Sequence, residues 1–334
     1  MGAAARRVTL RSPLPNEIEE SLRQHFRRAL AEHDCRTVYL APATSADIVF
    51  LETVAERGGE THIMLSEPKD RFVAALLESS SNAGWRARCE AALGQAQHVL
   101  DSGEQRAGSV SAYAQRLMHG LARLHAARLD SRVVSIGLRE PAVDPDAAGP
   151  ADQHTEDDRI VAILFADVPR FTRLSEEQLP SFVEHLLGNV RLVASTYSEA
   201  ILSRNTWGDG LYFVFSGVSD AGRFALDLSD RLALIDWPGH GLPLDLGLRI
   251  ALHAGPAYRF VDPVTGAVTY TGPHVSRAAR LEPITPPRHV YTSEAFAALA
   301  ATDAPELRCD YVGRTSMAKG YGVFPTYHLR RSGT

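Results

Sequence analysis

The sequence predicts a mixed α+β sheet backed by helices in its second half, preceded by an α/β domain with parallel strands. Apolar runs typical of strands alternate with amphipathic stretches typical of helices along the whole chain. Residues 37–65 follow the order strand, helix, strand, which is typical of a parallel pair with a crossover helix. Residues 139–158 are acidic and rich in proline, with almost nothing to bury. We therefore divide the chain into an accessory domain (1–138), a linker (139–158) and a second domain (159–334).

Composition excludes several classes of function. The 334 residues are 45% hydrophobic and 22% charged, as in an ordinary globular protein that buries real cores. A net charge of −5 argues against a broad nucleic-acid surface. The three cysteines are far apart and predict buried thiols in a reducing compartment. No signal peptide or membrane-spanning stretch is visible. We expect a cytoplasmic protein with neither nucleic-acid nor membrane partners.

The elements of the first half follow from the spacing of apolar residues. Helical spacing predicts helices at residues 16–32, 46–57, 85–100 and 112–129. Short apolar runs predict strands at residues 37–41, 61–65 and 133–138. Gly58 and Gly59 end the second helix in the way that a C-terminal cap requires. His62, inside a strand, is expected to be a packed histidine rather than a ligand.

The second half begins with a run of seven apolar residues, 160–166, which predicts a strand buried on both faces. Ser175 and Gln178 have the form of a capping box that opens a long helix. Its apolar face would carry Phe182, Leu186, Val190, Val193 and Tyr197. Further strands are expected at 211–215 and 244–253, further helices at 221–234 and 275–281, and a hairpin over 258–270 that turns at 262–266.

Two aspartates carry the strongest chemical signal. Asp167 ends the apolar run of the first strand and opens a turn, while Asp209 follows Gly208 and precedes the apolar run 211–215. Either aspartate alone would be read as a turn or cap residue. Two carboxylates at strand ends are, however, the oxygen ligands that a pair of hard divalent cations needs. The pair therefore indicates phosphate chemistry.

Five motifs surround these aspartates and together resemble the class III nucleotidyl cyclases. They are Phe165-Ala166-Asp167-Val168, Thr206-x-Gly208-Asp209, Leu248-Arg249-Ile250-x-x-His253-x-Gly255, Gly272-x-x-Val275-x-x-Ala278-Ala279-Arg280-Leu281 and Ala318-Lys319-Gly320. One such motif would be weak support, whereas five in family order are strong support. The resemblance implies a ferredoxin-like core that converts a nucleoside triphosphate into a 3′,5′-cyclic nucleotide and pyrophosphate.

The resemblance also implies site residues. Asp167, Asp209 and the backbone of Val168 would hold two divalent cations, Mg²⁺ or Mn²⁺. Arg280 matches the transition-state arginine, and Ser276 stands where most members have an asparagine that orients the ribose. The positions matching phosphate contacts are Phe171 and Thr172 of the turn, Arg249 and Lys319, with Arg170 standing where the family usually has glycine.

The expected base pocket departs most from the family pattern. Asn205 stands where adenylyl members have lysine and guanylyl members glutamate, and Thr269 where they have aspartate and cysteine. The hydrogen-bonding groups of these two residues select neither adenine nor guanine, so a pyrimidine base is also compatible with them. We expect core packing for the neighbouring Trp207 and Tyr270, with base stacking as the alternative.

The chain thus looks similar to uridylate and cytidylate cyclases of bacterial Pycsar-type antiphage systems. We predict UTP as substrate and cyclic UMP as an antiviral second messenger. An adenylate cyclase making cyclic AMP is the alternative enzyme. A catalytically degenerate nucleotide-binding regulatory module is the alternative of another class. Retention of both aspartates and Arg280 argues against the degenerate module.

The resemblance further implies a head-to-tail homodimer with composite sites. The metal aspartates would come from one chain, and Ser276 and Arg280 from the other. Residues 13–138 resemble a Rossmann-like region that is often joined to bacterial cyclases, through residues 46–52 and 59–65. Because residues 41–45 lack the glycines of a phosphate-binding turn, a scaffold is favoured over a ligand sensor.

Overall fold

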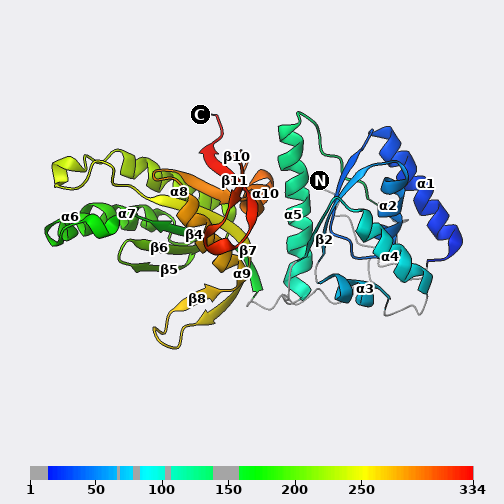
Figure 1. Ribbon diagram of the computed structural model, residues 1–334, viewed down its shortest axis with the longest axis horizontal. Helices are drawn as coiled ribbons and strands as arrows, with labels where there is room; N and C mark the ends of the chain where they lie inside the picture. The colour runs from blue at the N-terminus through cyan, green and yellow to red at the C-terminus, as the bar shows by residue number, and fades with distance from the viewer. Residues whose placement is uncertain (1–13, 66–67, 78–82, 102–106, 138–157, 334) are drawn as a thin grey trace. The chain divides into compact units, whose positions relative to one another are not determined.

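The computed structural model describes residues 14–65, 68–77, 83–101, 107–137 and 158–333 (Figure 1). The chain forms two compact units, residues 1–154 and 155–334. Each unit has its own sheet, and the two are described separately.

The N-terminal unit is built on a small parallel sheet. Strands β1 (Thr37–Leu40), β2 (Glu60–Leu65) and β3 (His98–Asp101) pair in that order, all parallel. Helix α2 (Ser45–Glu56) joins β1 to β2, so the predicted parallel pair with a crossover helix is confirmed. The remaining helices are α1 (Asn16–Glu32), α3 (Lys69–Leu77), α4 (Ala83–Gln95) and α5 (Ala107–Arg128).

In this unit one predicted helix ends early and one predicted strand is not formed. The helix expected over 85–100 ends at Gln95, because Gly94 is a poor helix former and the next apolar run pairs with β2 as strand β3. The strand expected over 133–138 is absent from residues 133–137, and Leu138 lies outside the described residues. Most of residues 133–137 are exposed, and none of them joins a sheet. A short apolar run alone is therefore not enough to form a strand.

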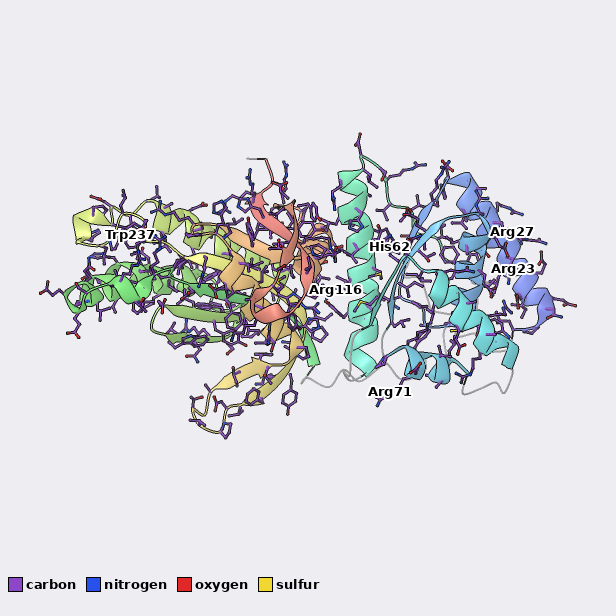
Figure 2. All side chains as sticks on the ribbon, in the orientation of Figure 1. Arg23, Arg27, His62, Arg71, Arg116 and Trp237 are labelled. Carbon is purple, nitrogen blue, oxygen red and sulfur yellow. The ribbon has the colours of Figure 1, made fainter. Side chains whose placement is uncertain are left out.

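Charged side chains join three helices of this unit. Arg23 and Arg27 lie along α1 (Figure 2), and Arg23 forms ion pairs with Glu19 and Glu52. Arg88 of α4 donates to the same two carboxylates, with Nε 2.7 Å from Glu52 and Nη2 2.7 Å from Glu19. Burial opposes ionisation of Glu52, but the hydrogen bonds from Arg88 and Arg23 hold its pKa below the ordinary value. The cluster fixes α1 against α2 and α4.

Aromatic and imidazole rings gather between the sheet and α5. His62, labelled in Figure 2, stacks on Tyr39 with ring centroids 4.6 Å apart, and the Tyr39 hydroxyl lies 2.6 Å from Nδ1 of His125. Burial lowers the pKa of His125. The predicted packing role of His62 agrees with these contacts.

The second unit contains a mixed eight-stranded sheet, so the predicted sheet type is confirmed. Strands β10-β11-β9-β7-β4-β6-β5 lie side by side, and β8 pairs with β7. All pairs are antiparallel except β7 with β9. The strands are β4 (Asp158–Asp167), β5 (Ile201–Trp207), β6 (Gly210–Phe215), β7 (Arg249–Val261), β8 (Val268–Thr271), β9 (Val290–Ser293), β10 (Leu307–Ser316) and β11 (Val323–Arg331).

Helices cover both faces of this sheet. The main ones are α6 (Leu179–Phe182), α7 (Gly188–Thr196), α8 (Val218–Ala233), α9 (Pro273–Leu281) and α10 (Glu294–Asp303). Because side chains alternate along a strand, Phe213 and Phe215 point to one face, where both contact Phe224 of α8. Ile163 and Tyr212 point to the other face and form one core with Ala278 of α9. This second face, called the α9 face below, carries most of the candidate site residues.

Several boundaries in this unit differ from the predictions. Asp158, assigned to the linker, already belongs to β4, and the rest of the predicted linker lies outside the described residues. The strand expected over 244–253 begins only at Arg249 and runs on to Val261. Its first residues form a loop instead, and Arg288 donates to the carbonyls of Leu244 and Leu246. Side-chain caps of this kind replace the hydrogen bonds of a strand ladder.

The long helix predicted after Ser175 is broken into pieces. A 3₁₀ turn (Glu176–Gln178) leads into α6, then a π-helical segment (Val183–Leu187) and then α7. Ser175 and Gln178 form the predicted capping box, in which the Gln178 side chain accepts the Ser175 N–H at 3.1 Å. The π segment inserts extra backbone that periodicity does not reveal. Four of the five predicted apolar residues are buried, and Tyr197 is half-buried.

Two buried histidines link α9 to the sheet. His253 Nε2 lies 2.7 Å from Nδ1 of His274, and His253 Nδ1 lies 2.6 Å from the hydroxyl of Ser293. The pair fits only because Gly255 has no side chain, since a Cβ there would lie 2.2 Å from His274 Nδ1. Burial lowers the pKa of both rings, to about 3 for His274. Both imidazoles are therefore neutral in the folded protein.

This pair makes the second unit sensitive to acid. Between about pH 6.5 and pH 3 the two imidazoles bind protons in the unfolded chain but not in the folded one. The free energy of unfolding therefore falls as the pH falls. Each histidine contributes up to ~1.4 kcal/mol per pH unit within its window. We expect the melting temperature to fall less from about pH 7 to about pH 5 in His274→Asn than in the wild type. Calorimetry at both values checks this, and equal pH slopes would contradict it.

Candidate functional site

Asp167 and Asp209 meet at one edge of the sheet. Asp167 is the last residue of β4, and Asp209 lies in the two-residue turn between β5 and β6. Strands β4 and β6 are neighbours, with Ala166 opposite Leu211. The two carboxyls are close enough to share a hydrogen bond, and Asp209 also accepts the backbone N–H of Val168. Burial, together with this hydrogen bond and the charge of Asp167, raises the pKa of Asp209 to about 6.

Arg249 and Glu282 lie beside the two aspartates, and these four residues are called the acidic end below. Arg249, the first residue of β7, donates through Nη2 to Asp167 Oδ2 at 2.5 Å and forms an ion pair with Glu282. Burial is the main reason that the pKa of Glu282 is raised to about 7, and the charges of Asp167 and Asp209 add to the effect. Glu282 was not among the predicted site residues, and its only sequence signal is that it follows the Arg280-Leu281 motif. Arg249, expected at the phosphates, here neutralises the carboxylates.

The acidic end fits divalent cations. Arg249 is paired with Asp167 and Glu282, while Asp209 lies beside Asp167, and burial together with the neighbouring negative charges makes Asp209 and Glu282 resist ionisation. A bound cation would relieve this excess of negative charge, and carboxylate oxygens suit Mg²⁺ or Mn²⁺. Among the described residues no three His, Cys, Asp or Glu side chains form a ready metal cage. Two aspartates supply only part of the ligands of a divalent cation, so substrate phosphates and water would complete its coordination, as is usual for Mg²⁺.

The turn after Asp167 is tighter than expected. It leads into a three-residue 3₁₀ helix, Phe171–Arg173, in which the Phe171 N–H donates to Val168 O at 3.2 Å. This bond uses one of the N–H groups expected to face phosphate. Arg170 has a left-handed backbone (φ 65°) that costs about 1 kcal/mol for a non-glycine residue. Its guanidinium lies 3.4 Å from Asp245 rather than over the turn. Thr172 is exposed.

Ser276, Arg280 and Lys319 lie in a second, basic group. Arg280 Nη1 donates to the carbonyl of Ser276 at 2.9 Å, one turn earlier on α9. Its guanidinium also lies over the ring of Tyr321, 4.5 Å from the centroid. Lys319, two residues before Tyr321, is exposed and has a left-handed backbone (φ 59°). Among the described residues, the contacts of Arg280 are with this group and not with Asp167 or Asp209.

Asn205 and Thr269 lie on either side of Tyr212. Asn205 faces Tyr212 across the β5–β6 pair, so both side chains point to the α9 face. Thr269 of β8 is hydrogen-bonded through its hydroxyl to that of Tyr212. The structure thus brings together the two residues expected to read the base, and it adds Tyr212, which the sequence analysis missed. An apolar-looking strand gave no signal for it.

The expected packing role holds for one neighbouring aromatic residue and fails for the other. Tyr270 is 6% exposed and belongs to the core under α9. Trp207 is 54% exposed, with its ring 6.4 Å from that of Phe165. The prediction of core packing is therefore wrong for Trp207, because its strand position is the last before the turn and nothing covers it on the described chain.

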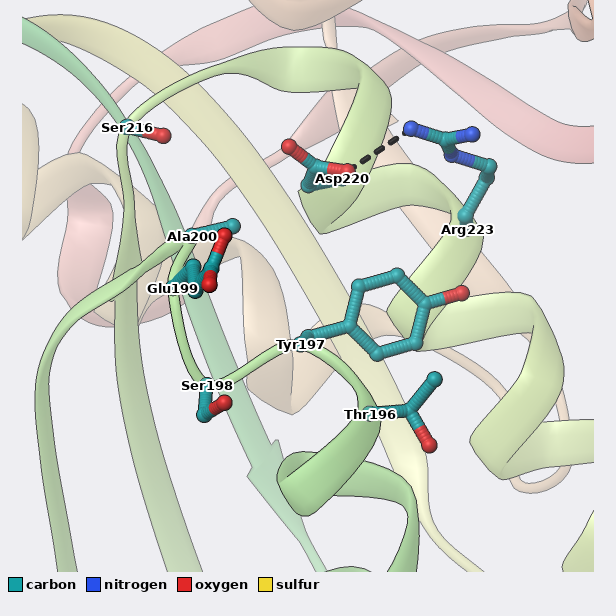
Figure 3. A pocket seen from close by; sticks show the side chains of 8 residues that line it. All are labelled: Thr196, Tyr197, Ser198, Glu199, Ala200, Ser216, Asp220 and Arg223. Atoms are coloured by element: carbon teal, nitrogen blue, oxygen red, sulfur yellow. Dashed lines mark hydrogen bonds and ion pairs between the residues drawn. The ribbon is translucent and has the colours of Figure 1, made fainter.

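A polar hollow of about 610 Å³ lies elsewhere (Figure 3). It is lined by residues 196–200, Ser216, Asp220 and Arg223, and the last two pair at 2.7 Å. Ser216 follows the far end of β6, roughly 20 Å along the strand from Asp209 at 3.3 Å per residue. The hollow is therefore separate from the candidate site.

Comparison with known families decides the identity. The family described as "Adenylate and Guanylate cyclase catalytic domain" matches residues 153–331, which is more than half of the chain. The chain belongs to this family. The cyclase domain so defined contains every candidate site residue named above, and membership implies nucleotide cyclase activity.

Solved cyclase domains resemble this one. The guanylate cyclase domain of RhGC from Catenaria anguillulae, in complex with GTP, has 19% identity over 53% of this chain and 99% of that chain (TM-score 0.46). The adenylyl cyclase CyaB from P. aeruginosa has 17% identity over 52% and 94% (TM-score 0.45). No curated protein matches the sequence. Among the described residues of this cyclase, no helix has both the length and the apolar character needed to cross a membrane.

Proposed function

We propose that the protein cyclises a nucleoside triphosphate to a 3′,5′-cyclic nucleotide and pyrophosphate, with UTP as the preferred substrate. The observation that carries this is the meeting of Asp167 and Asp209 beside Arg249 at the end of β4. Two divalent cations held by these carboxylates and the Val168 backbone would supply Lewis acidity and neutralise the triphosphate. Phosphoryl transfer needs little else from a protein beyond positioning and charge.

The side chains of the protein position the substrate and stabilise the transition state. The ribose 3′-oxygen attacks the α-phosphorus, its proton passes to water, and the bond to the leaving pyrophosphate breaks. Arg280 stabilises the charge that develops on the α-phosphoryl oxygens, and Ser276 hydrogen-bonds the ribose. Lys319 and Arg249 contact the leaving phosphates, Arg249 turning from Asp167 once that carboxylate has another counter-charge. The turn residues Phe171 and Thr172, with Arg170, lie next to the same phosphates.

The aspartate pair, Asp167 and Asp209, belongs to one half of a site, and Ser276 and Arg280 belong to the other half. Because the contacts of Arg280 are with Ser276 and Tyr321 of its own chain, we place its substrate contact across a homodimer interface. One chain then supplies Asp167 and Asp209, and its partner supplies Ser276 and Arg280. Each homodimer has two such sites, and a monomer has none.

The preference for UTP is supported by the hydrogen-bonding groups of the base pocket. Asn205 offers an amide donor and Thr269 an acceptor, which match the O4 carbonyl and N3–H of uracil. In a shifted pose, with Asn205 facing N1 and Thr269 facing the amino group, the same pair would match adenine, so ATP is the second candidate. We further propose that the product acts as an antiviral second messenger, with the N-terminal unit as a Rossmann-like scaffold. Its three parallel strands in sequential order support that scaffold role.

The test is to incubate the purified protein with Mn²⁺ and each of the four nucleoside triphosphates and to identify products by mass. We expect cyclic UMP and pyrophosphate in equal amounts. Turnover of ATP but not UTP would replace UTP by the second candidate. Binding without turnover of any nucleotide would point instead to a regulatory module.

A further inference from the structure

Two side chains, Thr269 and Tyr212, and the Tyr270 carbonyl form a short chain of hydrogen bonds beneath the proposed base pocket. The hydroxyl of Tyr212, a residue that is only 5% exposed, donates to the Tyr270 carbonyl at 3.1 Å. Its single proton is thereby committed. The hydrogen bond between Tyr212 and Thr269 must then use the Thr269 proton, so Thr269 donates to the phenol oxygen. What Thr269 presents to the pocket is a hydroxyl oxygen, which accepts.

The Asn205 side chain is oriented so that it presents hydrogen-bond donors, whereas Thr269 presents an acceptor. Its Oδ1 accepts the backbone N–H of Thr206 at 2.8 Å. A backbone N–H can only donate, so the oxygen end of the amide must face it, and the amide nitrogen points away with its two donors. Asn205 lies directly opposite Tyr212, and the hydroxyl of Ser203 ties β5 to Val268 of β8 at 2.9 Å. These contacts hold Asn205 and Thr269 on the same face of neighbouring segments.

We propose that Tyr212 fixes the hydrogen-bond polarity of the base pocket, with Asn205 as donor and Thr269 as acceptor, and thereby determines which class of base is cyclised. The inference rests on the proposed function. Adenine and cytosine present an amino donor beside a ring-nitrogen acceptor, whereas guanine and uracil present a carbonyl acceptor beside a ring N–H. Once the triphosphate fixes the pose, a pocket of fixed polarity accepts one class and leaves polar groups unpaired against the other.

Tyr212→Phe keeps the buried ring and removes only the oxygen. The Thr269 hydroxyl can then rotate and donate, so discrimination between the preferred base and the best base of the other class should fall about tenfold. The ratio of dissociation constants for the four 3′-deoxynucleoside triphosphates with Mn²⁺ measures this, because these ligands lack the attacking hydroxyl and cannot cyclise. Tyr197→Phe is the matched control, since its hydroxyl bonds Asp227, outside the proposed base pocket.

Thr269→Val tests independently whether Tyr212 acts by orienting the Thr269 hydroxyl. It removes the acceptor that Tyr212 orients, so it should also lower discrimination about tenfold, and Tyr212→Phe should add nothing in that background. An unchanged ratio in Tyr212→Phe, or equal effects of that substitution in both backgrounds, would overturn the role of Tyr212. Either result would indicate that the tyrosine acts through packing alone.

Asn205→Asp separates this inference from the proposed function. It replaces the donor by a charged acceptor and should weaken binding of the preferred nucleotide more than tenfold. If Asn205→Asp changes no affinity, the base pocket itself is wrongly placed and the proposed function loses its support for UTP. If Asn205→Asp weakens binding while Tyr212→Phe and Thr269→Val leave discrimination intact, only the role of Tyr212 fails.

Discussion

Replacing Asp167 with alanine is expected to lower cyclic nucleotide formation by roughly 10³-fold or more, because it removes one of the two carboxylates that would hold the cations. The fold should survive. Arg249 keeps its ion pair with Glu282, and β4 keeps its pairing with β6 and β7. The measurement is the rate of product formation at saturating Mn²⁺ and nucleotide, with the melting temperature as a check on folding.

Asp236→Ala is the matched control for this substitution. Asp236 is an exposed carboxylate that accepts the Gly239 N–H at 3.2 Å and contacts none of the site residues named here. Its loss should leave the rate within about twofold of the wild type. A folded Asp167→Ala protein with a near-normal rate would show that the aspartate pair is not the cation site.

Replacing Arg280 with alanine is expected to lower kcat by about 10³-fold with little change in KM. An arginine that meets charge only in the transition state contributes on this scale to phosphoryl transfer. Lysine at this position should restore only part of the rate, because it lacks the planar fork that matches phosphoryl oxygens. Steady-state kinetics of both variants check this. Arg223→Ala, which removes an arginine of α8 paired with Asp220, is the control and should behave as wild type.

An increase in KM alone for Arg280→Ala would contradict the proposed role. That result would mean that Arg280 binds the ground state and the transition state equally well. Because Arg280 packs on Tyr321, loss of the side chain could also disturb the loop that carries Lys319. The lysine variant separates the two effects, since it keeps a cation over the ring.

The part of the cyclase domain around β4, β6, β7, α8 and α9 could be read from its sequence, because these elements are apolar runs or amphipathic stretches with turn residues between them, whereas β5, β9, α10, β10 and β11 were not predicted. Asp167 and Asp209 were each placed at a strand end from local pattern alone. The family motifs implied that the two aspartates meet, and the pairing of β4 with β6 is what brings them together in the structure. Periodicity worked wherever one face of an element was buried, as it was for Phe182, Leu186 and Val190.

What the sequence could not show depends on contacts between distant segments. Glu282 is a site residue only because η5 (Glu282–Ile284) brings it to Arg249, and Tyr321 matters only because its ring lies under Arg280. Arg249 was matched to the phosphates by motif, whereas its contacts in the folded chain are with carboxylates. The π segment at Val183–Leu187 has no periodic signature at all. In each of these cases tertiary packing decides and local pattern carries no information.

Mixing two inactive variants tests whether one chain's aspartates work with the other chain's arginine. Asp167→Ala chains keep Arg280, and Arg280→Ala chains keep both aspartates. After exchange of subunits, half of the dimers should be mixed, and each mixed dimer should contain one complete site. The mixture should therefore recover about a quarter of the wild-type rate. A mixture whose dimers have exchanged subunits, yet which is no more active than its two components measured separately, would contradict the composite site.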